Sequence, residues 1–193
     1  MRKGNQGDRR AAWIAAAGAV VLFAVLSFPC NYWLSLTMPR HQAIQLPAML
    51  LIGLALGGVA RKVNVKDLSW GLALLLLAMG SLIFWMLPRS IDLAVIHPWF
   101  NRVMHLHMVA TGSAIAITLR NMPFELKIAF PGMLAGMLIA TGASLRAFTI
   151  LLCSSFTIEQ QHETGMWLML IGLALAIWTA AAFIRALGAG GRS

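Results

Sequence analysis

Long apolar runs separated by short polar segments dominate the chain. Six of these runs are long enough for a membrane-spanning helix, which needs roughly 20 predominantly apolar residues. The runs lack the period-2 alternation of barrel strands, and only helices or closed barrels satisfy every backbone hydrogen bond inside a bilayer. The pattern predicts an all-α polytopic membrane protein, a bundle of about six transmembrane helices in one domain. That single transmembrane domain, 1–193, would hold helices at about 11–34, 43–60, 69–88, 99–119, 127–152 and 164–186.

The composition agrees with this pattern, because 60% of the residues are hydrophobic and only 11% are charged. A soluble domain is rarely so apolar, so the expected partner of most of the surface is the lipid bilayer. About six crossings use up the chain, which leaves no room for a separate soluble domain.

The formal net charge of +9 indicates orientation rather than a nucleic-acid partner. Basic residues lie between the apolar runs instead of clustering on one element, as they would in a nucleic-acid-binding domain. Lys and Arg accumulate in cytoplasmic loops, and only Arg40, Arg89, Arg102 and Arg146 fall outside when the N-terminus is placed inside. We therefore predict both termini in the cytoplasm of a multi-pass protein of the cell (inner) membrane. The cytoplasmic set is Arg2, Lys3, Arg9, Arg10, Arg61, Lys62, Lys66, Arg120, Lys127, Arg185 and Arg192.

Residues that could bind a metal gather at the outer ends of the predicted helices. Thiolate, thioether and imidazole groups together form the ligand set that suits Cu(I). We take His41, His105, Met38 and Met108 as the candidate metal ligands, with Cys30 as an additional candidate. The outer residues of these types are Cys30, Met38, His41, His97, His105, His107, Cys153 and His162.

His105 lies inside a predicted transmembrane helix, where an ionisable side chain is a functional-site candidate. It shares a helix face with Arg102 and Met108, whereas His107 is turned about 200° away. The two histidines are therefore expected to face different partners. A structural role in hydrogen bonding between helices is an equally weighted alternative.

Two further patterns concern cysteine and glycine. The sequence leaves three options open for Cys30 and Cys153: a disulfide, a metal-binding pair or two unrelated thiols. The G-x-x-x-G segments at 53–57 and 132–136 favour close packing of helices within the chain over a dimer interface.

Motifs of the common enzyme classes are missing from the sequence. It contains no H-E-x-x-H, G-x-S-x-G, P-loop or C-x-x-C, and its six acidic residues include none deep in a predicted helix. We therefore expect a protein that is not an enzyme, and proton-coupled transport is disfavoured because it usually needs an intramembrane carboxylate.

Three stretches share the pattern of one family. Residues 158–168 read IEQQHETGMWL, with an acidic residue, a Gln pair, a Gly and a Met-Trp that opens the last helix. Residues 87–99 read LPRSIDLAVIHPW and precede Met104-His105-Leu106, and residues 38–42 read MPRHQ, with Thr37 where an H-M-x-x-H motif would begin. These stretches resemble the CtaG-like membrane proteins, which assist the assembly of haem–copper cytochrome c oxidases. In that resemblance His105 is the counterpart of a helix histidine.

The resemblance implies an accessory factor that binds or delivers copper at the outer membrane face, with cytochrome c oxidase subunits as partners. Two alternatives stay open. His41 and His105 could instead hold a b-type haem between facing helices, or the chain could be a small carrier or scaffold whose histidines are structural. The sequence leaves the oligomeric state open.

Overall fold

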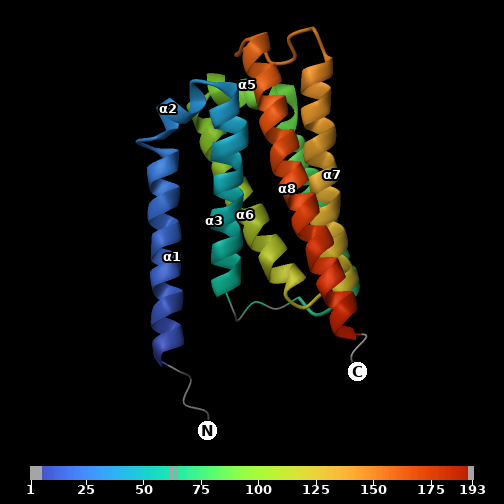
Figure 1. Cartoon of the computed structure of the whole chain (residues 1–193). Helices are drawn as coiled ribbons and strands as arrows, with labels where there is room; N and C mark the ends of the chain where they lie inside the picture. Colours follow the sequence, from blue (N-terminus) through green and yellow to red (C-terminus); the bar gives the residue numbers. More distant parts are fainter. Residues whose placement is uncertain (1–5, 61–62, 64, 191–193) are drawn as a thin grey trace. The chain divides into compact units, whose positions relative to one another are not determined.

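The computed structural model describes residues 6–60, 63 and 65–190, with side chains described from residue 10 to residue 188 except within the gap around 61–64. Every regular element in these residues is a helix, so the predicted all-α class is confirmed (Figure 1). The elements are α1 (Gln6–Ser27), α2 (Asn31–Ser35), the π-helix η1 (Arg40–Gln45), α3 (Leu46–Val59), α4 (Leu68–Met86), α5 (Pro88–Ile96), α6 (Pro98–Leu119), α7 (Phe124–Ala147) and α8 (Ile158–Gly190).

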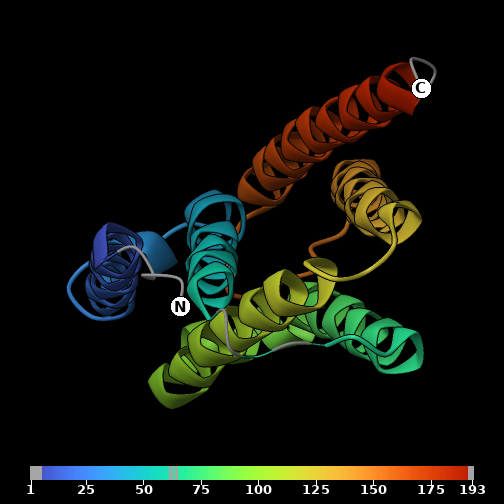
Figure 2. The same ribbon diagram turned by 90° about the horizontal axis from the view of Figure 1, so that it is seen from below.

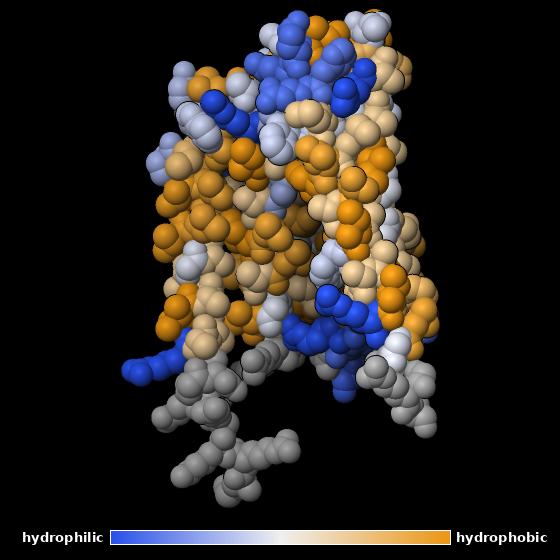
Figure 3. All heavy atoms as spheres, viewed as in Figure 1, coloured by the Kyte–Doolittle hydropathy of each residue, from blue (hydrophilic) through white to orange (hydrophobic). Residues whose placement is uncertain are grey.

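Five helical segments among the described residues are long and apolar enough to cross a membrane. Apolar side chains cover much of the visible surface (Figure 3). The exposed apolar residues of these segments include Trp13, Leu77 and Ile177. Such exposed apolar faces are stable in lipid and would be unfavourable in water. The chain is therefore a helical protein of membrane-spanning type. The five segments are Arg10–Ser27, Arg40–Val59, Leu68–Met86, Phe124–Ala147 and Ile158–Gly188.

The predicted fourth crossing corresponds to α6, which has 22 residues but is not one of these five segments. Asn101, Arg102, His105 and His107 lower its hydropathy. A crossing by α6, and with it the total of six, therefore stays a prediction. The orientation with both termini in the cytoplasm also stays a prediction.

Residue contacts divide the chain into two compact units, Met1–Asn121 and Met122–Ser193. In the first unit α6 packs against both α3 and α4, while α1 packs against α3 (Figures 1 and 2). The second unit is the pair α7 and α8, which pack along each other. Each unit thus has its own helix–helix contacts.

Glycines let α3 and α6 approach each other closely in the first unit. A Cβ on Gly53 would strike the Val109 carbonyl oxygen, and a Cβ on Gly57 would lie 2.5 Å from the Ser113 carbonyl oxygen. In return, a Cβ on Gly112 would strike the Leu50 carbonyl oxygen. The predicted intrachain packing of the G-x-x-x-G segment 53–57 is confirmed.

The second G-x-x-x-G segment behaves differently. Gly136 has no atom within 4 Å of a built Cβ, and the nearest to Gly132 is the Thr179 methyl at 4.0 Å. The close contact of the second unit instead joins Gly142 and Gly165, where each added Cβ would meet the other residue's carbonyl oxygen at 2.5 and 2.6 Å. The prediction of close packing at 132–136 was wrong, because these glycines do not face the backbone of a neighbouring helix.

α3 and α6 run parallel, since residue numbers rise together along their contact. Gly53 meets Val109 and Gly57 meets Ser113. Farther along, the Arg120 guanidinium donates to the carbonyl oxygens of Gly57 at 2.6 Å and Ala60 at 3.3 Å, which satisfies acceptors at the end of α3. The first residues of α6 and the segment before α3 therefore lie at the same end of the unit.

The chain between α1 and α3 is less regular than the sequence predicts. The first helix ends at Ser27 instead of continuing to about 34, because Pro29 follows and a short turn leads into α2. η1 then comes directly before α3, whose second residue is Pro47. Proline has no N–H to bond the preceding turn, so the wider π-helical turn is accommodated there.

The connection between α7 and α8 also differs from the predicted boundaries. α7 ends at Ala147 rather than near 152, and α8 begins at Ile158 rather than near 164. Gln161 organises the loop between them: its side-chain oxygen accepts from the Leu152 N–H at 2.8 Å, and its Nε2 donates to the carbonyl oxygens of Leu145 at 3.2 Å and Ile150 at 3.3 Å. Gln161, which belongs to the stretch 158–168 singled out in the sequence, thus stabilises a loop.

Replacing Gln161 with leucine is expected to destabilise the second unit by roughly 2 to 4 kcal/mol, because buried backbone groups lose their partners. Thermal unfolding in detergent should show a lower midpoint, and limited proteolysis should cut faster between residues 148 and 157. Glu163→Leu is the matched control, since Glu163 is an exposed residue of the same helix. Equal proteolysis rates in the two variants would contradict the role assigned to Gln161.

Candidate metal centre

His41 and His105 lie at the same end of the first unit. His41 belongs to η1 and His105 to the second turn of α6, and both side chains have an exposed fraction of 0%. The parallel packing of α3 and α6 explains this placement, because it brings the starts of both segments to one end.

One ring nitrogen of each histidine has a polar partner. His41 Nδ1 lies 2.7 Å from Gln45 Oε1, and His105 Nδ1 lies 3.1 Å from Ser27 Oγ. The other nitrogen, Nε2, is buried in both rings and has no hydrogen-bond partner among the residues that the structure describes. Leaving a buried polar atom unpaired costs about 1–3 kcal/mol, so each of the two atoms is a candidate ligand position.

Thioether side chains share the buried surface of these elements. Met38, three residues before His41, and Met104, next to His105, are both fully buried. Met108, one turn beyond His105, has an exposed fraction of 4%. The same end of the unit therefore combines imidazole nitrogen with soft sulfur.

An amide network surrounds the histidines. Gln45 Nε2 donates to the Leu26 carbonyl oxygen at 3.2 Å and to Asn31 Oδ1 at 3.0 Å. Asn101 Nδ2 donates to the same Asn31 oxygen at 2.8 Å. The network joins α1, α2, η1 and α6 around the His41 ring.

Four residues of this arrangement were not predicted from the sequence as site residues: Ser27, Asn31, Gln45 and Asn101. A usable signal existed for Gln45, because a glutamine four residues after a histidine in an apolar run is itself a costly intramembrane polar group. The signal for Asn31 and Ser27 was absent, since their role depends on how α1 and α2 fold back.

The two cysteines belong to different units. Cys30 is half-buried at the start of α2 in the first unit, Cys153 is buried in the second, and the structure forms no disulfide between them. Among the residues that the structure describes, no three His, Cys, Asp or Glu residues are grouped as metal ligands. Cys30 therefore does not complete such a group with the two histidines, and its role as a ligand stays a prediction.

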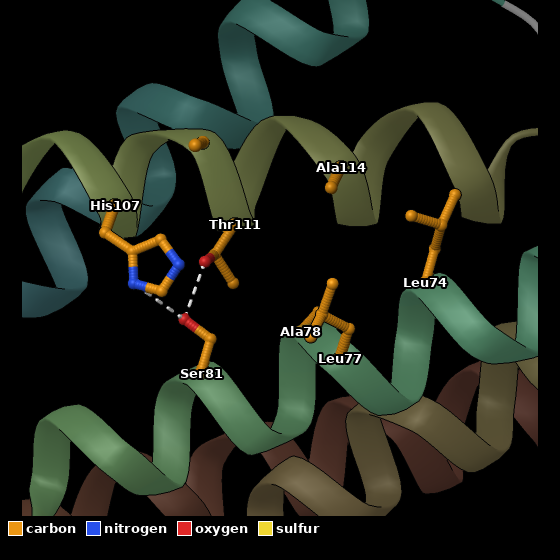
Figure 4. A pocket seen from close by; sticks show the side chains of 8 residues that line it. Leu74, Leu77, Ala78, Ser81, His107, Thr111 and Ala114 are labelled. Atoms are coloured by element: carbon orange, nitrogen blue, oxygen red, sulfur yellow. Dashed lines mark hydrogen bonds between the residues drawn. The ribbon is translucent and has the colours of Figure 1, made fainter.

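His107 faces a different neighbour from His105, as predicted. Its Nδ1 accepts a hydrogen bond from Trp85 Nε1 at 2.6 Å and lies 3.4 Å from Ser81 Oγ, which in turn lies 2.8 Å from Thr111 Oγ1. Ser81, His107 and Thr111 line a pocket of about 150 Å³ between α4 and α6 (Figure 4). The rest of its lining is apolar: Leu74, Leu77, Ala78, Ala110 and Ala114.

Comparison with known proteins adds no family to this description. No protein-family model, curated protein or solved structure matches the chain. The fold and the buried histidine pair thus define a helical protein of membrane-spanning type with a candidate metal centre, and the resemblance to CtaG-like proteins stays a prediction.

Proposed function

We propose that this protein binds Cu(I) between His41 and His105 and delivers it during the assembly of a haem–copper cytochrome c oxidase. The observation that supports the proposal is the pair of buried Nε2 atoms, which have no hydrogen-bond partner in the described part of the chain. A metal ion bound to both nitrogens would remove the cost of leaving them unpaired. Met38, Met104 and Met108 would add soft donors to the same site.

The donor chemistry favours Cu(I) over a divalent ion. Imidazole and thioether are neutral ligands, and the proposed set holds no carboxylate to balance a 2+ charge. Placing an uncompensated double charge in a buried site costs far more than placing a single charge there. Soft sulfur ligands also select Cu(I).

Neutral ligands suit delivery as well as binding. A thiolate must take up a proton when its metal leaves, whereas thioether and neutral imidazole ligands need not. The site would therefore release copper to a receiving protein without a protonation step. The receiving oxidase subunit is inferred from the family resemblance alone.

In the proposed arrangement α6 also crosses the cell (inner) membrane, as the fourth of six crossings. Both termini then lie on the cytoplasmic side. The distribution of basic residues supports this orientation. It puts the metal centre near the outer face, because the first turns of α6 follow the outer loop. A fluorescent protein fused to the C-terminus should be bright, as it folds in the cytoplasm, and a dark fusion would argue for the opposite orientation.

A b-type haem is the second candidate, because two facing imidazoles are also a haem ligand set. The test is the purified protein itself. We expect a colourless preparation without a Soret band that binds one Cu(I) in competition with a chromophoric chelator. A Soret band would establish the haem alternative. A protein with no Soret band and no Cu(I) binding would favour a carrier or scaffold whose histidines are structural.

The delivery role is tested in cells that lack the protein. We expect them to assemble less haem–copper oxidase, with partial recovery when copper is added to the medium. Normal oxidase in the deletion strain would exclude a role in its assembly.

A further inference from the structure

We infer that Gln45 is a positioning residue that holds His41 in the tautomer with the proton on Nδ1, so that the Nε2 lone pair faces the candidate metal centre. The consequence for copper rests on the proposed function, whereas the tautomer itself does not. The inference depends on which way the Gln45 amide points, and the neighbours of that amide decide its orientation.

The backbone fixes the orientation of the Gln45 side chain. A carbonyl oxygen can only accept a hydrogen bond, so the Leu26 carbonyl oxygen, 3.2 Å away, must face the NH₂ group of Gln45. The second N–H of that group is used by Asn31 Oδ1 at 3.0 Å. The Gln45 Oε1 atom is therefore the one that faces His41.

That oxygen fixes the proton on His41. Gln45 Oε1 only accepts, and it lies 2.7 Å from His41 Nδ1, so Nδ1 must be the donor. In a neutral imidazole the other nitrogen then carries the lone pair, which is the form that binds a metal. This nitrogen, Nε2, is buried and forms no hydrogen bond within the described residues.

Asn31 links the Gln45 amide to α6. Its Oδ1 accepts from both Gln45 Nε2 and Asn101 Nδ2, at 3.0 and 2.8 Å. Gln45 is thereby held from α1, α2 and α6 together, which limits the rotation of its amide. Metal-bound histidines commonly have such a partner on the second nitrogen, and its loss typically lowers metal affinity 10- to 100-fold.

His105 offers a natural comparison within the same site. Its Nδ1 faces Ser27 Oγ at 3.1 Å, and a hydroxyl can either donate or accept. Ser27 therefore does not select a tautomer. Of these two histidines, His41 is the one whose Nδ1 faces an atom that can only accept.

The first experiment is ¹⁵N NMR of the full-length, metal-free protein labelled at histidine, with the His41 signals assigned by their loss in His41→Ala. We expect Nδ1 protonated and Nε2 bare in the wild type. In Gln45→Met, which keeps the length of the side chain but loses its acceptor, the two nitrogens should share the proton. Ser27→Ala, at the partner of His105 Nδ1, should leave the His41 signals unchanged.

The second experiment measures Cu(I) affinity in the same variants. We expect Gln45→Met to bind roughly 10- to 100-fold more weakly than the wild type. A protonated Nε2 in the wild type would overturn the inference, even if the variant fails to fold. A changed tautomer with unchanged Cu(I) affinity would overturn the positioning role. The predicted tautomer in a wild-type protein that binds no Cu(I) would support the structural assignment and remove the proposed function.

Discussion

Replacing His41 and His105 together with alanine is expected to abolish Cu(I) binding, with a loss well beyond the roughly 10- to 100-fold that removal of an outer-shell partner causes. Both imidazoles have a buried Nε2 atom that forms no hydrogen bond with any residue the structure describes. Thioethers alone remain in the double variant. The measurement is a competition titration of the purified protein against a chromophoric Cu(I) chelator.

Two controls separate ligand loss from a damaged fold. His41→Leu with His105→Leu fills the buried volume that alanine leaves empty, and it should bind copper as poorly as the alanine variant while unfolding near the wild-type temperature. His107→Ala changes the same helix away from the site, because His107 contacts Trp85 and Ser81, and it should keep wild-type affinity. Tight copper binding by the double variant would show that the site lies elsewhere.

Replacing Gly112 with leucine is expected to disrupt the contact between α3 and α6. A Cβ at this position already strikes the Leu50 carbonyl oxygen and lies 3.0 Å from the Gly53 Cα. Backbone atoms cannot rotate away as a side chain can, so we expect a destabilisation at or above the roughly 1–3 kcal/mol typical of overpacking. Separation of the two helices should also move His105 away from His41 and weaken Cu(I) binding.

Thermal unfolding in detergent, followed by the Cu(I) titration, measures both effects. Gly80→Leu is the matched control, since no atom lies within 4 Å of a Cβ built on this glycine of α4. The control should unfold within a few degrees of the wild type and bind copper normally. If Gly112→Leu behaved like Gly80→Leu, the close approach of α3 and α6 would not determine stability.

Much of the fold was predictable because a long apolar run indicates a helix that is in contact with lipid. The apolar runs located the long helices, and the spacing of Gly53 and Gly57 identified one close contact. The same motif failed at 132–136, since the spacing of small residues does not reveal which face of a helix meets its neighbour. Helix ends at Ser27 and Ala147 were missed because turns and side-chain bonds decide them.

The candidate site was predicted in part. The cost of a polar group inside a membrane singled out His105, and the soft ligands around it pointed to copper. The pairing of His41 with His105 was only one option among several, because sequence spacing cannot show that α3 and α6 run parallel. The amide network was out of reach, since it joins Leu26, Asn31 and Asn101 from three different elements.

In the proposed topology, α6 carries more polar side chains into the bilayer than the neighbouring helices do. Asn101, Arg102 and two histidines oppose its partition into lipid as a separate helix. Several of its polar side chains bond to segments made earlier: Asn101 to Asn31, His105 to Ser27 and Ser113 to the Gly53 carbonyl oxygen. In this topology we expect the membrane insertion of α6 to depend on its docking against α3, a step that would also bring the two candidate histidine ligands together.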